Sequence, residues 1–342
     1  MHKGKAIDIM ENNIILKVDS IKKYFPVKTG GFGRPHKWLK AVDGVSFEVS
    51  KDRVFAIVGE SGCGKSTIAR LVLRLLPLTD GRIYFKGEDV SHLSGDSLKK
   101  FRRSVQIVFQ DPFASLNPRM RIIDTLSEPF KIHKIVPKQD IKDRVVSLLE
   151  KVGLNSDALN RYPHEFSGGQ RQRICIARAL TVSPELIVAD EPLSALDVSI
   201  QAQILNLLQN IKRESAISLV FISHDLKVVH YLSDEVAVMY LGKIVEKAKT
   251  EDLFESPRHP YTELLLSSAP TIGVRHKAPS NMHRATDFRV SPHMDFVDIP
   301  SPIDIPSGCP FHPRCAKRFD VCDKVIPELK DIDSRLVACH LY

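Results

Sequence analysis

The sequence at residues 59–67 reads Gly-Glu-Ser-Gly-Cys-Gly-Lys-Ser-Thr, and this stretch decides the expected fold. Residues 53–58 before it are largely apolar and rich in β-branched side chains, which predicts a buried strand. Residues 68–76 after it have apolar side chains at helical spacing. A G-x-x-x-x-G-K-S loop between a strand and a helix binds phosphate, because its backbone N–H groups and the helix N-terminus face the phosphate oxygens. We therefore expect Lys65 to reach the β- and γ-phosphates of a nucleotide and Ser66 to bind Mg²⁺.

The size and charge of the chain narrow its class. A chain of 342 residues predicts two or three lobes. The net charge of +8 is spread among 41 acidic residues without a block of like charge, which favours a solvated surface over a nucleic-acid-binding one. The sequence contains neither a run of about 18 apolar residues nor a signal peptide, so we expect a cytoplasmic protein.

Strands and helices are expected to alternate along the chain, which predicts an α/β fold. The expected strands cover 14–21, 41–49, 81–87, 105–109, 186–191 and 219–223. Helical patterns at 122–130 and 141–152 interrupt this alternation and indicate an inserted helical lobe. Tyr24, placed after the first strand at the edge of a loop, has two equally favoured interpretations, namely stacking on a nucleobase or packing in the core.

Polar side chains follow three of the expected buried strands. Gln110 ends one strand and is expected to ligate Mg²⁺ and contact the attacking water. Asp190 and Glu191 end another, where Asp190 suits the Mg²⁺ shell and Glu191 can polarise a water for attack on the γ-phosphate. His224 follows a third strand, at the sheet edge where α/β proteins hold ligands.

A second expected anion site begins at Ser167. This serine is in N-cap position, and Gly168 and Gly169 expose backbone N–H groups at the start of a helix. One chain rarely brings two such loops to one phosphate, so this site points to a dimer.

These motifs, with Ser-Ala-Leu-Asp at 194–197, resemble the ATP-binding subunit of an ABC transporter over about residues 14–255. The resemblance implies a P-loop NTPase fold with a RecA-like core, an antiparallel β subdomain and an α-helical subdomain inserted at about 111–183. It implies ATP and Mg²⁺ as cofactors. Glu191 resembles the general base, His224 the γ-phosphate switch and Asp197 the aspartate that communicates across the dimer. The implied nucleotide contacts are Tyr24, Gly59, Ser61, Gly62, Cys63, Gly64, Lys65, Ser66, Thr67, Ser167, Gly168, Gly169, Gln170 and Asp197. Phe166 departs from the leucine usual in this family.

Residues 256–342 form the expected C-terminal extension. His259-Pro260-Tyr261 and the loop at 111–118 resemble the oligopeptide and dipeptide importer branch of the family. That branch implies transmembrane permease subunits, a homodimer or a heterodimer with a paralogous ATPase, an indirect extracytoplasmic peptide-binding protein and a place on the cytoplasmic face of the membrane. It leaves nickel or another solute as an alternative to peptides. Residues 271–306 are expected to form an extended, irregular connection.

Four cysteines, Cys309, Cys315, Cys322 and Cys339, lie close together in the sequence near its end. Their spacing lacks the tight pairs of common zinc sites and favours a [4Fe–4S] cluster, with Zn²⁺ as the alternative. Such a centre is expected to hold the fold of the extension while the ATP site lies a full domain away. Cys63 and Cys175 are expected to be small buried residues.

Two other classes of protein remain open from the sequence. One is a soluble ABC ATPase of DNA repair or ribosome recycling, although such chains usually carry two cassettes or long coiled coils. The other is a zinc-stabilised regulatory module in which the extension determines the function.

Overall fold

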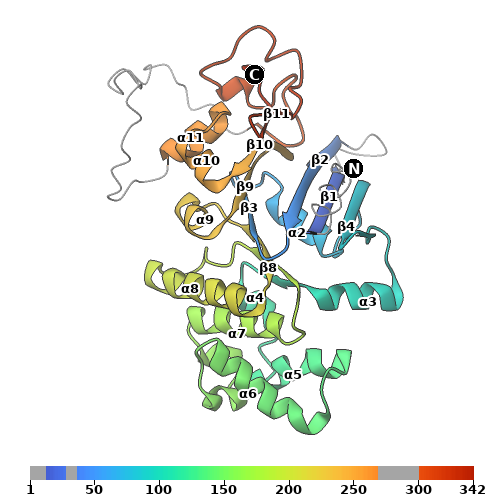
Figure 1. Ribbon diagram of the computed structural model, residues 1–342, viewed down its shortest axis with the longest axis vertical. Coiled ribbons are helices and arrows are strands. Elements are labelled where there is room, and N and C mark those ends of the chain that lie inside the picture. The colour runs from blue at the N-terminus through green and yellow to red at the C-terminus, as the bar shows by residue number, and fades with distance from the viewer. Residues whose placement is uncertain (1–12, 28–36, 269–299) are drawn as a thin grey trace, which may run out of the picture.

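The computed structural model describes residues 13–27, 37–268 and 300–342 (Figure 1). Most of the loop expected at 27–37 and of the connection expected at 271–306 lies outside these residues. Among the described residues, no helix combines the length and the apolar character needed to cross a bilayer.

The larger of two sheets has the strand order β11-β12-β10-β9-β3-β8-β7-β6. Its strands β9, β3, β8, β7 and β6 are parallel, whereas β10 runs antiparallel to β9. The strands are β3 (Val54–Val58), β6 (Val105–Val108), β7 (Leu186–Asp190), β8 (Ser218–Ile222), β9 (Glu235–Tyr240), β10 (Lys243–Lys249), β11 (Lys330–Ile332) and β12 (Arg335–Val337).

The central strands are buried on both faces, which explains why they read as continuous apolar runs. In β3, Val54 and Ala56 pack into one hydrophobic cluster, and Phe55 and Ile57 pack into another on the opposite face. Strands β7 and β8 alternate in the same way. The sheet therefore divides the core into two layers and presents the carboxyl ends of its parallel strands at one edge.

The second sheet is antiparallel and has the order β2-β1-β4-β5. Its strands are β1 (Ile14–Val27), β2 (Lys37–Ser50), β4 (Asp80–Phe85) and β5 (Glu88–Asp89). Strand β1 continues beyond the predicted end at Ile21, because β2 pairs with it as far as Val27 opposite Lys37. Tyr24 therefore lies inside a strand, and its predicted position at the edge of a loop was wrong.

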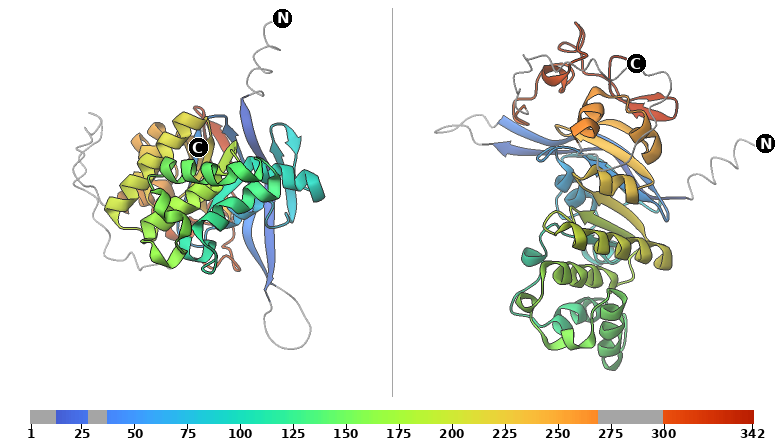
Figure 2. Two further views of the ribbon diagram at one scale, coloured as in Figure 1. Left: turned by 90° about the horizontal axis from the view of Figure 1, so that it is seen from below. Right: turned by 90° about the vertical axis from the view of Figure 1, so that its left-hand side faces the viewer.

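Helices surround the larger sheet and form a lobe at one end of the molecule. Helices α5, α6 and α7 lie together at the bottom of Figure 1, at the opposite end from the C-terminal segment, as the right-hand view of Figure 2 also shows, and α4 packs against α7. The helices are α2 (Lys65–Val72), α3 (Gly95–Ser104), α4 (Pro112–Ser115), α5 (Ile122–His133), α6 (Ile141–Lys151), α7 (Gly168–Leu180), α8 (Val198–Ser215), α9 (Leu226–Leu232), α10 (Thr250–Glu255) and α11 (Pro260–Ser268).

The C-terminal segment is built onto the larger sheet and its hydrophobic core. Strand β12 pairs with β10, with Val337 opposite Glu246. Phe311 is buried, and its ring centroid lies 5.4 Å from that of Tyr240 at the end of β9 and 5.3 Å from that of Tyr261. The expectation that the ATP site lies a full domain away from this segment is wrong, because the strand and the buried ring of the segment extend the main sheet and its core.

Candidate functional site

The loop at residues 59–67 links β3 to α2, as the sequence predicts. Gly64 has φ 111°, and a Cβ there would lie 2.0 Å from the backbone oxygen of Ala41, so only glycine fits. The Lys65 side chain is buried, and its Nζ donates hydrogen bonds to the carbonyl oxygens of Gly59 at 2.7 Å and Glu60 at 3.0 Å. The lysine is thus held inside the loop that is to receive the phosphates.

Two of the three residues expected to bind Mg²⁺, Ser66 and Asp190, come from chain segments that meet at the carboxyl edge of the sheet, and the third, Gln110, contacts Glu191 instead. Ser66 Oγ donates a hydrogen bond of 2.9 Å to Asp190 Oδ1. Burial raises the pKa of the Asp190 carboxyl, and the Ser66 hydrogen bond opposes this rise. A hydroxyl beside a carboxylate offers the oxygen ligands that Mg²⁺ prefers, so these two residues fit the ion.

Glu191 lies where four chain segments meet. Gln110 Nε2 donates a hydrogen bond of 3.2 Å to Glu191 Oε2, and His224 Nδ1 lies 3.2 Å from the same oxygen. Lys65 Nζ lies 4.0 Å from Glu191 Oε1. The Glu191 backbone has φ 46°, a conformation uncommon outside glycine that turns the chain at the end of β7. The structure therefore brings together all four residues predicted to act in catalysis.

Ser167 caps helix α7 as predicted. Its Oγ accepts a hydrogen bond of 3.3 Å from Gln170 N, and the Gln170 side chain accepts one of 3.0 Å from Ser167 N. Phe166 is buried in the hydrophobic core, so the departure from leucine preserves apolar packing, and the Arg161 guanidinium lies 4.3 Å from its ring centroid. Gly168 and Gly169 open the helix. The capped loop belongs to the helical lobe (Figure 1).

Tyr24 and Asp197 are the remaining predicted nucleotide contacts, and each belongs to an element other than the loop at 59–67 and helix α7. The Tyr24 hydroxyl donates a hydrogen bond to Asp43, and Lys40 Nζ lies 5.6 Å from the Tyr24 ring centroid. Asp197 is exposed at the start of α8, beyond the Ser-Ala-Leu-Asp turn.

Glu60 is a site residue that the sequence analysis missed. Both of its carboxylate oxygens accept hydrogen bonds of 2.8 Å from Arg314, and its N–H donates one of 3.0 Å to the Tyr261 hydroxyl. Arg314 lies 254 residues away in the sequence. The only available signal was His259-Pro260-Tyr261, which says nothing about where the tyrosine hydroxyl points.

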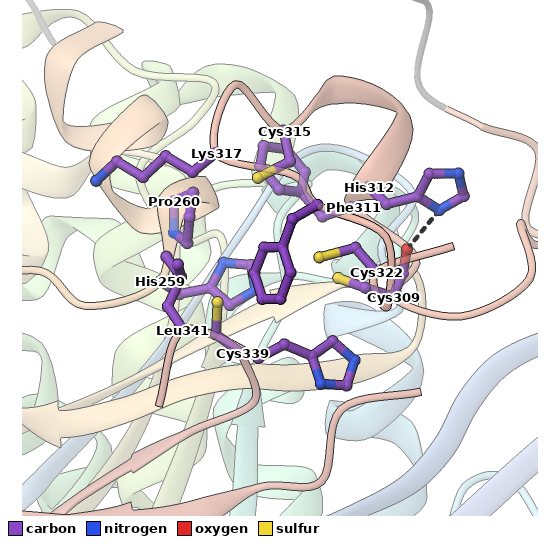
Figure 3. Close-up of a pocket in the computed structure, with 12 residues that line it drawn as sticks. His259, Pro260, Cys309, Phe311, His312, Cys315, Lys317, Cys322, Cys339 and Leu341 are labelled. Carbon is purple, nitrogen blue, oxygen red and sulfur yellow. Dashed lines mark hydrogen bonds between the residues drawn. The ribbon is translucent and has the colours of Figure 1, made fainter. Parts of the chain in front are cut away.

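The metal centre predicted in the C-terminal extension is not supported by the arrangement of side chains. Within residues 13–27, 37–268 and 300–342, no three or more His, Cys, Asp or Glu side chains are arranged as the ligands of a metal ion. Cys309, Cys315, Cys322 and Cys339 nevertheless line one pocket (Figure 3). Burial above all, together with the three other thiols, raises the pKa of Cys309 to about 11 against the lowering effect of a hydrogen bond from the Phe311 backbone. The four cysteine side chains therefore line the same pocket, but they are not arranged as the ligands of a metal ion.

Comparison with known proteins places these features in a family. The oligopeptide transport ATP-binding protein AppF of Bacillus subtilis is 50% identical over 330 residues, which is 96% of this chain and 97% of the relative. The dipeptide transport ATP-binding protein DppF of Escherichia coli is 45% identical over 325 residues, 95% of this chain and 93% of the relative. The chain belongs to the family of ABC transporter ATP-binding proteins. Members of this family hydrolyse ATP to drive transport, and this chain is such an ATPase.

Two family models and a solved structure also match this ABC ATPase. The ABC transporter model matches residues 42–194, and the model for the C-terminal region of oligopeptide/dipeptide transporters matches residues 245–322. A dimeric ATP-binding cassette solved in a post-hydrolysis state with ADP and phosphate has a TM-score of 0.62 and 27% identity. The match covers 69% of this chain and 99% of the cassette. The ATPase fold predicted from the sequence is therefore confirmed.

Proposed function

We propose that this ABC ATPase energises the import of dipeptides and oligopeptides through a membrane channel made by other chains. The observation that carries this proposal is the likeness over nearly the whole chain to relatives named as oligopeptide or dipeptide transport ATP-binding proteins. The match of residues 245–322 to the C-terminal region of peptide transporters supports the same substrate class.

The proposed chemistry is in-line attack of water on the γ-phosphate of ATP. Glu191 acts as general base, and Gln110 and His224 hold its carboxylate and the water, since both side chains lie 3.2 Å from Glu191 Oε2. Lys65 neutralises charge on the β- and γ-phosphates once it exchanges its carbonyl partners for phosphate oxygens. Mg²⁺ supplies further charge neutralisation, with Ser66, Asp190 and Gln110 as the residues that would hold it.

The nucleotide is proposed to lie between two subunits. The backbone of residues 59–67 would cradle the phosphates, and Tyr24 would stack on the adenine. Ser167, Gly168, Gly169 and Gln170 of a second subunit would close on the γ-phosphate, and Asp197 would relay this closure. The capped start of α7 supports this role because its backbone N–H groups form an anion site in a lobe separate from the phosphate loop. The second subunit is either another copy or a paralogue.

The C-terminal extension is proposed to hold a [4Fe–4S] cluster, with Zn²⁺ as the alternative. Four thiols that line one pocket support this assignment, because a cluster of this type takes four cysteine ligands. The ligands would be Cys309, Cys315, Cys322 and Cys339. The cluster would tie together positions 309 to 339 of the segment through its four ligands.

The proposed partners are transmembrane permease subunits and, indirectly, an extracytoplasmic peptide-binding protein, with the ATPase on the cytoplasmic face of the membrane. Uptake of a labelled tripeptide by cells that lack this gene tests the proposal. The wild-type chain should restore uptake, and Lys65→Ala should not. Restored uptake of nickel alone would replace peptides by nickel as cargo. Unchanged uptake of both, with copurification on ribosomes or DNA, would favour a soluble ABC ATPase instead.

A further inference from the structure

Every hydrogen-bonding group of Glu60 in the phosphate loop is engaged. Its carboxylate binds Arg314, its N–H binds the Tyr261 hydroxyl, and its carbonyl oxygen accepts from Lys65 Nζ at 3.0 Å. Two of these three partners come from the C-terminal extension. We propose that this extension takes part in ATP binding, with Arg314 and Tyr261 as positioning residues that hold and neutralise Glu60 so that the loop accepts the phosphates.

The ion pair between Arg314 and Glu60 is positioned to neutralise the Glu60 carboxylate inside the phosphate loop. It is bidentate, with two bonds of 2.8 Å, and the two side chains are only 15% and 23% exposed. Pairs of this geometry and burial are stronger than exposed ones, because water screens them less. The hydrogen bonds to Glu60 raise the pKa of Arg314, so its guanidinium remains charged.

Removal of Arg314 would leave a carboxylate without its countercharge in the loop that receives a polyanion. Glu60 directly follows Gly59 and precedes Lys65 by five positions. An unpaired negative charge there repels the phosphates of ATP and also attracts the Lys65 ammonium away from them. Arg314 therefore favours ATP binding through Glu60, without touching the nucleotide itself.

Tyr261 fixes the backbone of the same residue. Its side chain is fully buried, and its ring centroid lies 4.6 Å from that of Tyr240 and 5.3 Å from that of Phe311. Phe311 lies three residues before Arg314, so one aromatic cluster orients both groups that hold Glu60. Arg314 in turn precedes Cys315, which lines the cysteine pocket.

Steady-state ATP hydrolysis and equilibrium dialysis with ATP, both on the full chain, test the proposal. Arg314→Gln should raise KM and Kd for ATP roughly tenfold, since one charge near the phosphates is unbalanced, and should change kcat less than about twofold. The double variant Glu60→Gln/Arg314→Gln should recover most of the affinity, because it removes the unpaired charge. Asp333→Asn is the matched control, since it removes another contact of the extension, with Arg258 at 3.0 Å, and should leave KM unchanged.

A folded Arg314→Gln protein with wild-type KM and Kd would overturn the proposal, and so would a loss of affinity that Glu60→Gln fails to repair. If Arg314→Gln does not fold, Tyr261→Phe decides, because it removes only the hydroxyl and keeps the buried ring. A higher Kd for ATP in Tyr261→Phe supports the positioning role, and an unchanged Kd contradicts it. None of these outcomes depends on whether the cargo is a peptide.

Discussion

His224 Nδ1 lies 3.2 Å from Glu191 Oε2, although the two residues follow different strands of the main sheet. Strands β7 and β8 are parallel neighbours, so their carboxyl ends deliver these side chains to the same place. Gln110, which follows β6, reaches the same oxygen of Glu191 from the other side of β7. The arrangement concentrates polar groups beside the phosphate loop.

Lys65→Ala should abolish ATP binding. Its Nζ is buried in the loop and donates to the carbonyl oxygens of Gly59 and Glu60, which phosphate oxygens can replace, so alanine removes the central positive charge of the site. Equilibrium dialysis with ATP should show at least about a hundredfold weaker binding, on the scale of a lost charge-assisted contact in a partly buried site. Lys86→Ala, which removes an exposed ion pair with Glu185, is the control and should bind ATP normally. Wild-type affinity in Lys65→Ala would exclude the proposed phosphate site.

Ser167 is predicted to act on the nucleotide of a partner subunit. Ser167→Arg and Lys65→Ala proteins should each be inactive alone, because every composite site contains one defect. An equal mixture should regain up to about a quarter of wild-type ATPase activity, because half of the dimers are mixed and each mixed dimer contains one intact site. ATPase activity measured across mixing ratios checks this, and the absence of recovery at every ratio would count against a shared site.

Glu246→Gln should lower the free energy of unfolding by about 1–3 kcal/mol, because one buried N–H group loses its acceptor. The two oxygens of Glu246 accept from the N–H groups of Arg258 at 2.8 Å and His259 at 2.9 Å, and a glutamine can serve only one of them. Urea unfolding checks the prediction. The control is Glu235→Gln, a partly exposed carboxylate paired with Lys247, which should change stability by less than about 0.5 kcal/mol. Equal effects in the two variants would contradict this role for Glu246.

The cysteine pocket is predicted to bind about four irons per chain when the protein is purified without oxygen. Replacing any of Cys309, Cys315, Cys322 or Cys339 by serine should remove the brown colour and most of the iron. Cys175→Ser, at a buried cysteine outside the pocket, should keep both. Iron analysis and the visible absorption spectrum provide the measurement. Colourless protein with one bound zinc would replace the cluster by Zn²⁺, and metal-free protein would exclude both.

The catalytic group could be predicted from the sequence because its members follow apolar strands. Runs such as Leu186–Asp190 reveal parallel strands, and parallel strands bring their following residues to one edge. The N-cap of α7 could also be predicted, because it depends on a local pattern: Ser167 and Gln170 lie at capping-box spacing.

The parts that could not be predicted depend on contacts between distant segments. Strand β1 extends to Val27 only because β2 pairs with it, and no local pattern marks that pairing. Glu60 occupies a position of the phosphate motif where any residue type is accepted, and its partner Arg314 is 254 residues away. The position of the extension against the core follows from Phe311 and β12, whose single ring and short strand give no periodic signal.

ATP turnover by Glu191→Gln tests the central claim most directly. A glutamine at position 191 can still form hydrogen bonds with Gln110 and His224, but it lacks the basic carboxylate. The account predicts that the variant binds ATP with wild-type affinity and accumulates as an ATP-bound dimer, while hydrolysis falls at least about a hundredfold. Near-wild-type turnover in a variant that binds ATP normally would contradict the account.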